Sequence, residues 1–184
     1  MGNQIKRSVG TQICFANHSG DFAPSGQLDL RQGTPGETQL TLTAATTAAR
    51  QSAKVDLGEL RAPAYSVDAV LHWATAPVIG TNVEVYWAPS HDPTAGNGNP
   101  ALLTGSDAAY TGYADLDDCF QHMTHIGNFS ASDYTAWPQI GHIGVFSPPS
   151  RYGIVVINNE TAQALSAYTS QMHIVFTPII DEVE

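Results

Sequence analysis

The segment 117–130, DDCFQHMTHIGNFS, contains residue types that bind metals or transfer protons. Cys119, His122 and His125 follow one another at intervals of three, directly after two acidic residues. Zinc needs three or four nitrogen or sulfur ligands that converge tetrahedrally. Residues three apart point to opposite faces of a strand, so His122 and His125 could reach one ion only from a helix. Because no second cysteine or histidine pair is nearby, we expect no metal here, although the sequence leaves a zinc site open.

A second group of oxygen-bearing side chains lies in the glycine- and asparagine-rich segment 91–118. Its members are Asp92, Asn97, Asn99, Asp107, Asp115, Asp117 and Asp118. Calcium accepts such ligands, but the spacing does not match D-x-[DN]-x-[DN]-G with its distant glutamate. We interpret the segment as a long exposed loop in which Gly and Asn supply turn conformations, and calcium remains the alternative.

Motifs for catalysis are missing from the sequence. There is no G-x-S-x-G, and the glycine-rich GNGNP is not followed by the lysine and helix start that hold a phosphate. A nucleophile also needs a histidine positioned beside it, and the seven histidines are scattered singly. We therefore expect no catalytic residue, no cofactor and no enzymatic activity.

The elements that must position these residues show the periodicity of strands. In YSVDAVLHWAT, Val67 and Trp73 fall on one face, and Asp68 and His72 fall on the other. Five other segments between residues 39 and 179 alternate in this way or form continuous apolar runs, most of them bounded by Gly, Pro, Asn or Asp. Six or seven strands predict an all-β, antiparallel β-sandwich of jelly-roll or Ig-like type.

At most one or two short helices are expected in this sandwich. The candidate is YTGYADLDDCFQHM, where Tyr113, Leu116, Phe120 and Met123 recur at helical spacing. Upstream, residues 1–38 lack sustained periodicity and contain many turn formers. They predict an extended amino-terminal arm, with one short strand at 11–15, that lies on the sandwich domain formed by residues 39–184.

A short sequence recurs in the second half of the chain. HIGNFS at 125–130 is echoed by HIGVFS at 142–147. Two similar strand segments explain the echo, with Gly127 and Gly144 at bulges or at close backbone contacts.

Composition and charge exclude several classes of protein. Charged residues make up only 13% of the 184 residues, and Thr, Ser, Ala, Gly and Pro take their place, which suits strands and turns. Up to Arg61 the formal charge is +1, whereas the remainder is −11. Phosphates would repel so acidic a body, so we expect no nucleic-acid partner. No apolar run is long enough for a signal peptide or a membrane span, so no membrane is expected.

Aromatic residues outside the strands are candidates for contact with a partner or a glycan. They are Tyr110, Tyr113, Tyr134 and Trp137, all in loop-like sequence.

The last third of the chain resembles structural proteins of tailed-phage virions, above all β-sandwich capsid decoration (cement) proteins. The resemblance lies in SPPSRYGIVVINNETAQALSAYTSQMHIVFTPI, where Pro149, Arg151 and Tyr152 lead into an apolar strand. The segment NNETAQALSA then crosses over to a last strand that ends at a proline.

The resemblance implies a binding role in the virion without catalysis. The partner would be the major capsid protein, whose shell this chain would stabilise from outside as a homo-oligomer, with a trimer favoured. The arm could clamp the shell or a neighbouring subunit, with Lys6, Arg7, Phe15 and Arg31 as its contacts. The alternative is a tail, neck or fibre module that binds a tail protein or a glycan.

Overall fold

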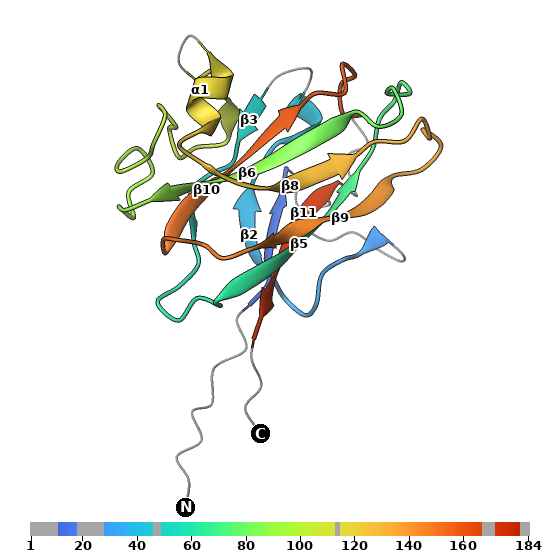
Figure 1. Cartoon of the computed structure of the whole chain (residues 1–184). Coiled ribbons are helices and arrows are strands. Elements are labelled where there is room, and N and C mark those ends of the chain that lie inside the picture. Colours follow the sequence, from blue (N-terminus) through green and yellow to red (C-terminus); the bar gives the residue numbers. More distant parts are fainter. Residues whose placement is uncertain (1–10, 18–27, 46–48, 113–114, 167–171, 181–184) are drawn as a thin grey trace, which may run out of the picture.

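The computed structural model describes residues 11–17, 28–45, 49–112, 115–166 and 172–180. These residues form two β-sheets, a 3-10 turn, η2 (Leu42–Ala44), and one short α-helix, α1 (Leu116–Phe120) (Figure 1). None of the described helices has the length and apolarity to cross a membrane. The all-β prediction is confirmed, and assignment to the jelly-roll or the Ig-like type stays a prediction.

Each sheet is assembled from strands that are distant in the sequence. The first sheet has the order β2 (Gly36–Gln39), β1 (Ile13–Ala16), β11 (His173–Ile179), β5 (Ala64–Leu71) and β9 (Gln139–Phe146). The second has the order β7 (Ala108–Ala109), β3 (Ala49–Gln51), β10 (Tyr152–Asn159), β6 (Asn82–Ser90) and β8 (Thr124–Ser130), with β4 (Val55–Asp56) also on β10. The pairings are antiparallel except for β1 with β2, which run parallel.

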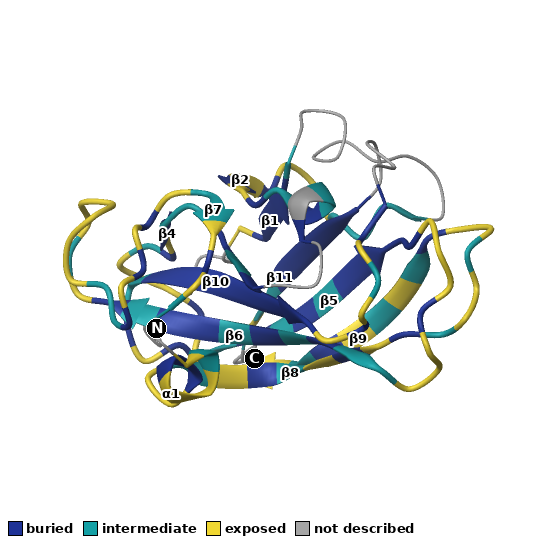
Figure 2. Ribbon diagram, turned by 90° about the horizontal axis from the view of Figure 1, so that it is seen from above, coloured by how far each residue is buried: buried dark blue, intermediate teal, exposed yellow. Residues whose placement is uncertain are grey.

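Apolar side chains from both sheets meet in one core. The indole of Trp87 on β6 lies 5.5 Å from the ring of Phe146 on β9 and 6.1 Å from Phe176 on β11, measured between centroids. The central strands β10 and β11 are largely buried, as the dark blue of Figure 2 shows, whereas the edge strands β8 and β9 are partly exposed. The predicted inward face of YSVDAVLHWAT is confirmed, because Val67 and Trp73 are fully buried. This core forms because alternate residues of a strand point to the same side.

β10 is buried on its outer side as well. There, α1 and the segment 101–110 cover it, and the phenol ring of Tyr86 stacks on Phe120 at 4.4 Å. Asp115 caps α1 by accepting a hydrogen bond from the backbone N–H of Asp117 at 2.9 Å, which satisfies a helix N–H that has no internal partner. The predicted short helix is confirmed, and coverage on both faces explains why GIVVI is apolar throughout.

β1 and β2 belong to the first sheet, and β2 runs across the boundary predicted at residue 38. Phe15 of β1 is fully buried, with its ring 4.8 Å from that of Phe176. This corrects the expectation that Phe15 contacts a partner. The short strand predicted at 11–15 is present as Ile13–Ala16, but the turn formers around it gave no sign that it pairs with β11, near the opposite end of the chain.

The repeated His-Ile-Gly sequences face each other across the edges of the two sheets. The pairing of β8 with β6 and that of β9 with β5 each contain a register shift, at which Ile126 and Ile143 are skipped. A Cβ atom at Gly144 would lie 2.5 Å from the carbonyl oxygen of Ile126, and one at Gly127 would overlap the carbonyl of Ile143. The prediction of bulges or close backbone contacts at both glycines is confirmed.

Candidate protein-binding surface

Two loops meet at one end of the molecule. Because Leu71 pairs with Gln139, and Asn82 pairs with Ser130, the β5–β6 loop (72–81) and the β8–β9 loop (131–138) leave the sheets at the same end (Figure 1).

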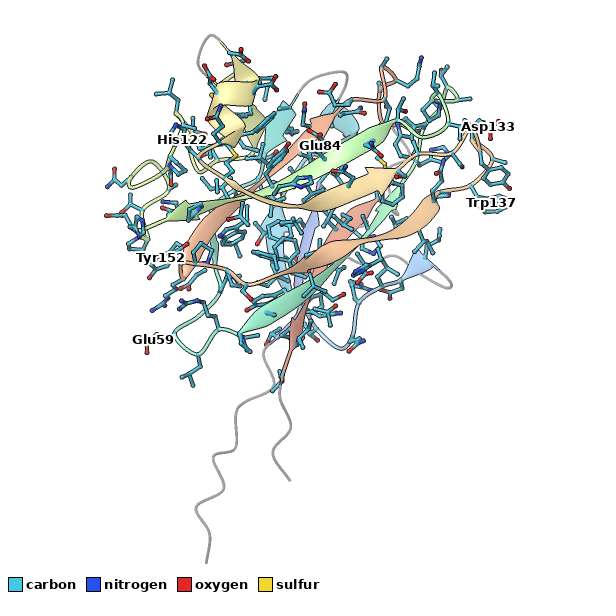
Figure 3. The ribbon with its side chains drawn as sticks, in the orientation of Figure 1. Glu59, Glu84, His122, Asp133, Trp137 and Tyr152 are labelled. Carbon is cyan, nitrogen blue, oxygen red and sulfur yellow. The ribbon has the colours of Figure 1, made fainter. Side chains whose placement is uncertain are left out.

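Five large apolar side chains are exposed on these loops and at the start of β9. We call them the end surface: Val78 (70% exposed), Ile79 (69%), Tyr134 (51%), Trp137 (60%) and Ile140 (50%). Figure 3 shows Trp137 and Asp133 at this end of the molecule. Exposed apolar groups that gather in one place mark sites of contact with other molecules.

Backbone hydrogen bonds join the two loops. The N–H of Ala131 donates to the carbonyl of Thr81 at 2.8 Å, and the N–H of Gly80 donates to the carbonyl of Ala131 at 3.1 Å. The Nε2 atom of His72 lies 3.0 Å from the carbonyl oxygen of Thr135. His72, predicted on the solvent face of its strand, is therefore buried, because the β8–β9 loop covers it.

The side chain of Gln139 holds the β8–β9 loop from within. Its Oε1 atom accepts from the backbone N–H of Ser132 at 3.0 Å. Its Nε2 atom donates to the carbonyls of Ser132 at 3.1 Å and Tyr134 at 2.9 Å. A loop fixed in this way presents Tyr134 and Trp137 with little conformational entropy left to lose on binding.

The end surface lies in a part of the chain that has no basic residue. Residues 62–150 contain eight acidic residues and no lysine or arginine. Asp133 is exposed beside Tyr134, and Glu160 is exposed where its N–H donates to the carbonyl of Asn82 at 3.0 Å. The apolar side chains are thus bordered by negative charge.

The structure separates the aromatic residues that the sequence grouped together. Tyr134 and Trp137 are exposed and belong to the end surface. Tyr110 is not on an exposed surface, which corrects that expectation: it is buried, and its hydroxyl donates to the carbonyl of Ala101 at 2.8 Å. Tyr113 lies outside the described residues, as do Lys6 and Arg7 of the predicted arm.

Sequence reasoning missed Val78, Ile79 and Ile140. The available signal for the first two was the adjacent pair Val-Ile between Pro77 and Gly80, where turn formers leave no strand to bury them. Ile140 gave no such signal, because it follows the alternation of a strand.

The three candidate zinc ligands do not converge. The thiol of Cys119 is buried and donates to the carbonyl of Asp115 at 3.3 Å. His125 lies 2.7 Å from the Oδ1 atom of Asn128, and His122 is exposed. In the described part of the chain, no three His, Cys, Asp or Glu side chains are placed to hold a metal.

One His–Asp pair forms on the outer side of the first sheet. The Nδ1 atom of His142 lies 2.9 Å from Oδ1 of Asp68, whose Oδ2 accepts from the hydroxyl of Ser66 at 3.2 Å. The serine therefore bonds to the aspartate and not to the histidine, which is the wrong order for activating a nucleophile.

The segment once considered for calcium folds around a lysine. The ammonium group of Lys54 donates to the carbonyls of Asp92 at 2.9 Å, Thr94 at 2.6 Å and Asn97 at 2.7 Å. Burial lowers the pKa of Lys54, and the charge of Asp92 acts in the opposite direction. Backbone carbonyl oxygens of this segment, and not the side-chain oxygens that suggested a cation site, thus surround a cation that belongs to the protein.

Replacing Lys54 by methionine is expected to lower the free energy of unfolding by about 1–2 kcal/mol, because three carbonyls lose their charged donor. Amide hydrogen exchange in residues 91–98 should rise at the same time. Arg61→Met removes an exposed cation and serves as the control, with an expected change within about 0.5 kcal/mol. If amide hydrogen exchange in residues 91–98 were unchanged in Lys54→Met, the lysine would not be what holds this loop in place.

In comparisons with known proteins, neither a family model nor a curated protein nor a solved structure matches this chain. The site therefore has to be interpreted from its own geometry. It offers a fixed apolar surface for binding.

Proposed function

We propose that this chain is a structural protein of a tailed-phage virion, which binds the outer surface of the capsid as a decoration (cement) protein and stabilises the shell. The observation that supports a binding role is the end surface, which presents large apolar side chains on two loops already joined by hydrogen bonds. Such a surface needs little ordering when it binds, which favours stable attachment.

The segment that resembles virion proteins supplies the central strand of each sheet. Residues 148–179 contain β10, third in the order of the second sheet, and β11, third in the order of the first. The resemblance therefore concerns strands at the centre of both sheets.

We assign the contact with the shell to the end surface and not to the amino-terminal arm. Phe15 is buried, and Arg31 is paired with Asp29 at 2.8 Å. Trp137 and Ile79 are instead the side chains that a capsid surface could cover. Many copies on one shell would add weak contacts into strong attachment, and a homotrimer would raise this effect further.

Co-sedimentation with capsids that lack this protein tests the proposal. We expect wild-type protein to bind at many copies per particle, and Trp137→Ser to bind about 30-fold more weakly, as expected when a central aromatic contact is lost. Leu60→Ser is the matched control, because Leu60 is 85% exposed in the loop before β5, away from the end surface. Failure to bind, together with absence from purified particles by mass spectrometry, would exclude the virion role.

A tail, neck or fibre module is the second candidate. Exposed Tyr134 and Trp137 beside the carboxylate of Asp133 are the groups with which proteins stack and hydrogen-bond sugars. Copy number separates the two candidates, because quantitative mass spectrometry of particles should find only a few copies of a tail part.

A further inference from the structure

We propose that the end surface binds a protein partner with an apolar pocket bordered by lysine or arginine side chains, and not a second copy of this chain. This inference rests on the proposed function, since it names the kind of partner that the proposed contact surface takes.

The shape of the end surface calls for a pocket in the partner. Ile79 and Trp137 project from two different loops, and each keeps at least 60% of its surface exposed. The loops are fixed to each other through Ala131 and Thr81. Large side chains held at a protruding end bury most area when they enter a pocket, as anchor residues of protein interfaces do.

The charge around the end surface selects a basic partner. Asp133 and Glu160 are exposed at this end. No basic residue occurs between Arg61 and Arg151 in the sequence, and among the described residues no ion pair joins either carboxylate to a Lys or Arg. Complementary charge at the rim of an interface speeds association and rejects wrong partners.

The basic residues that the structure describes would not supply that charge from a second copy of the chain. Within the described residues, three of the arginines are already paired with carboxylates: Arg31 with Asp29, Arg50 with Asp107 and Arg151 with Asp56. Lys54 donates to three backbone carbonyls of residues 92–97 in its own chain.

Arg61 is the other described arginine. It lies before the first residue of β5, whereas the β5–β6 loop of the end surface follows the last residue of this strand. The eight residues of this strand separate the two by about 24 Å. Two end surfaces facing each other would therefore bring carboxylates together with none of the described basic residues between them.

The tryptophans provide a direct measurement. Trp73 and Trp87 are fully buried, and Trp137 is 60% exposed, so quenching by acrylamide reports on Trp137. The probes are two synthetic amphipathic helical peptides of equal length, one composed of Leu and Lys and the other of Leu and Glu. We expect the Leu–Lys peptide to shift Trp137 emission to the blue and to protect it from acrylamide, and the Leu–Glu peptide to bind at least about tenfold more weakly.

Three variants test whether the end surface is responsible. Ile79→Ser should lower the affinity for the Leu–Lys peptide about tenfold. Asp133→Asn should lower it about threefold and make the affinity less dependent on salt. Leu60→Ser should leave binding unchanged. Because these side chains are exposed, an unchanged unfolding midpoint will show that the variants fold.

Equal binding of both peptides would overturn the inference, as would binding that Ile79→Ser leaves intact. A dimer seen by sedimentation without peptide and abolished by Ile79→Ser would show that the occupant is a second copy. The capsid experiment is independent of the peptides. A chain that binds the basic peptide but no capsid would contradict the proposed function and leave this inference standing.

Discussion

Replacing Gly153 by alanine is expected to lower the free energy of unfolding by about 3 kcal/mol, because an added methyl group has no room in the core. Gly153 lies on β10, two residues before Val155, and Val155 pairs with Trp87 on β6. The six-membered ring of Trp87 lies over the glycine, and a Cβ atom there would come within 2.7 Å of Cη2 and closer still to Cζ2. Urea unfolding followed by circular dichroism measures the loss.

A second substitution tests whether Trp87 is the cause. Trp87→Phe removes the atoms that would clash, and it also removes an indole N–H that has no hydrogen-bond acceptor among the described residues. The loss in the free energy of unfolding of the double variant should therefore be smaller, by at least about 1 kcal/mol, than the sum of the losses in the two single variants. Gly36→Ala on β2 is the control, since the nearest atom to its Cβ would be at 3.8 Å. Purely additive effects would show that the strain at Gly153 arises elsewhere.

The pairing of Gly153 with Trp87 also illustrates what the sequence can and cannot predict. Alternation identified β5 and β6, because Val67, Val85 and Trp87 recur at the spacing of a strand with one buried face. It could not identify the glycine under the tryptophan, because that contact depends on the register between two strands far apart in the chain. The hydrophobic pattern indicates which face of a strand is buried, but it does not show which distant strand lies beside it.

The same limit applies to the candidate site. Tyr134 and Trp137 were predicted from their loop-like surroundings, and Tyr110 was placed with them because its neighbours are also turn formers. Contacts decide between such residues: Tyr110 is buried and donates to the carbonyl of Ala101, whereas Trp137 in the β8–β9 loop stays 60% exposed. The carbonyl oxygens around Lys54 were likewise hidden, since at least 38 residues separate the donor from its acceptors.

The repeated His-Ile-Gly sequence is the exception, because there the sequence carried a long-range signal. Two similar segments in one chain adopt similar conformations, and both are bulged at the isoleucine. The bulges turn Gly127 and Gly144 toward the opposite strand, where each approaches the carbonyl of the other segment's isoleucine. The contact therefore joins the edge strands of both sheets, which protects them from pairing with other chains.

Gly127→Ala is accordingly expected to lower the free energy of unfolding by about 2–3 kcal/mol, because its methyl group would overlap a backbone carbonyl that cannot rotate away. Gly144→Ala should have a smaller effect of about 1–2 kcal/mol, since its Cβ would stop 2.5 Å from the carbonyl oxygen of Ile126. Both variants should exchange the amide hydrogens of β8 and β9 faster than the wild type, as local opening predicts. Gly96→Ala is the control, because nothing lies within 4 Å of the added atom. If Gly127→Ala matched this control in stability, the two edge strands would not be in backbone contact in solution.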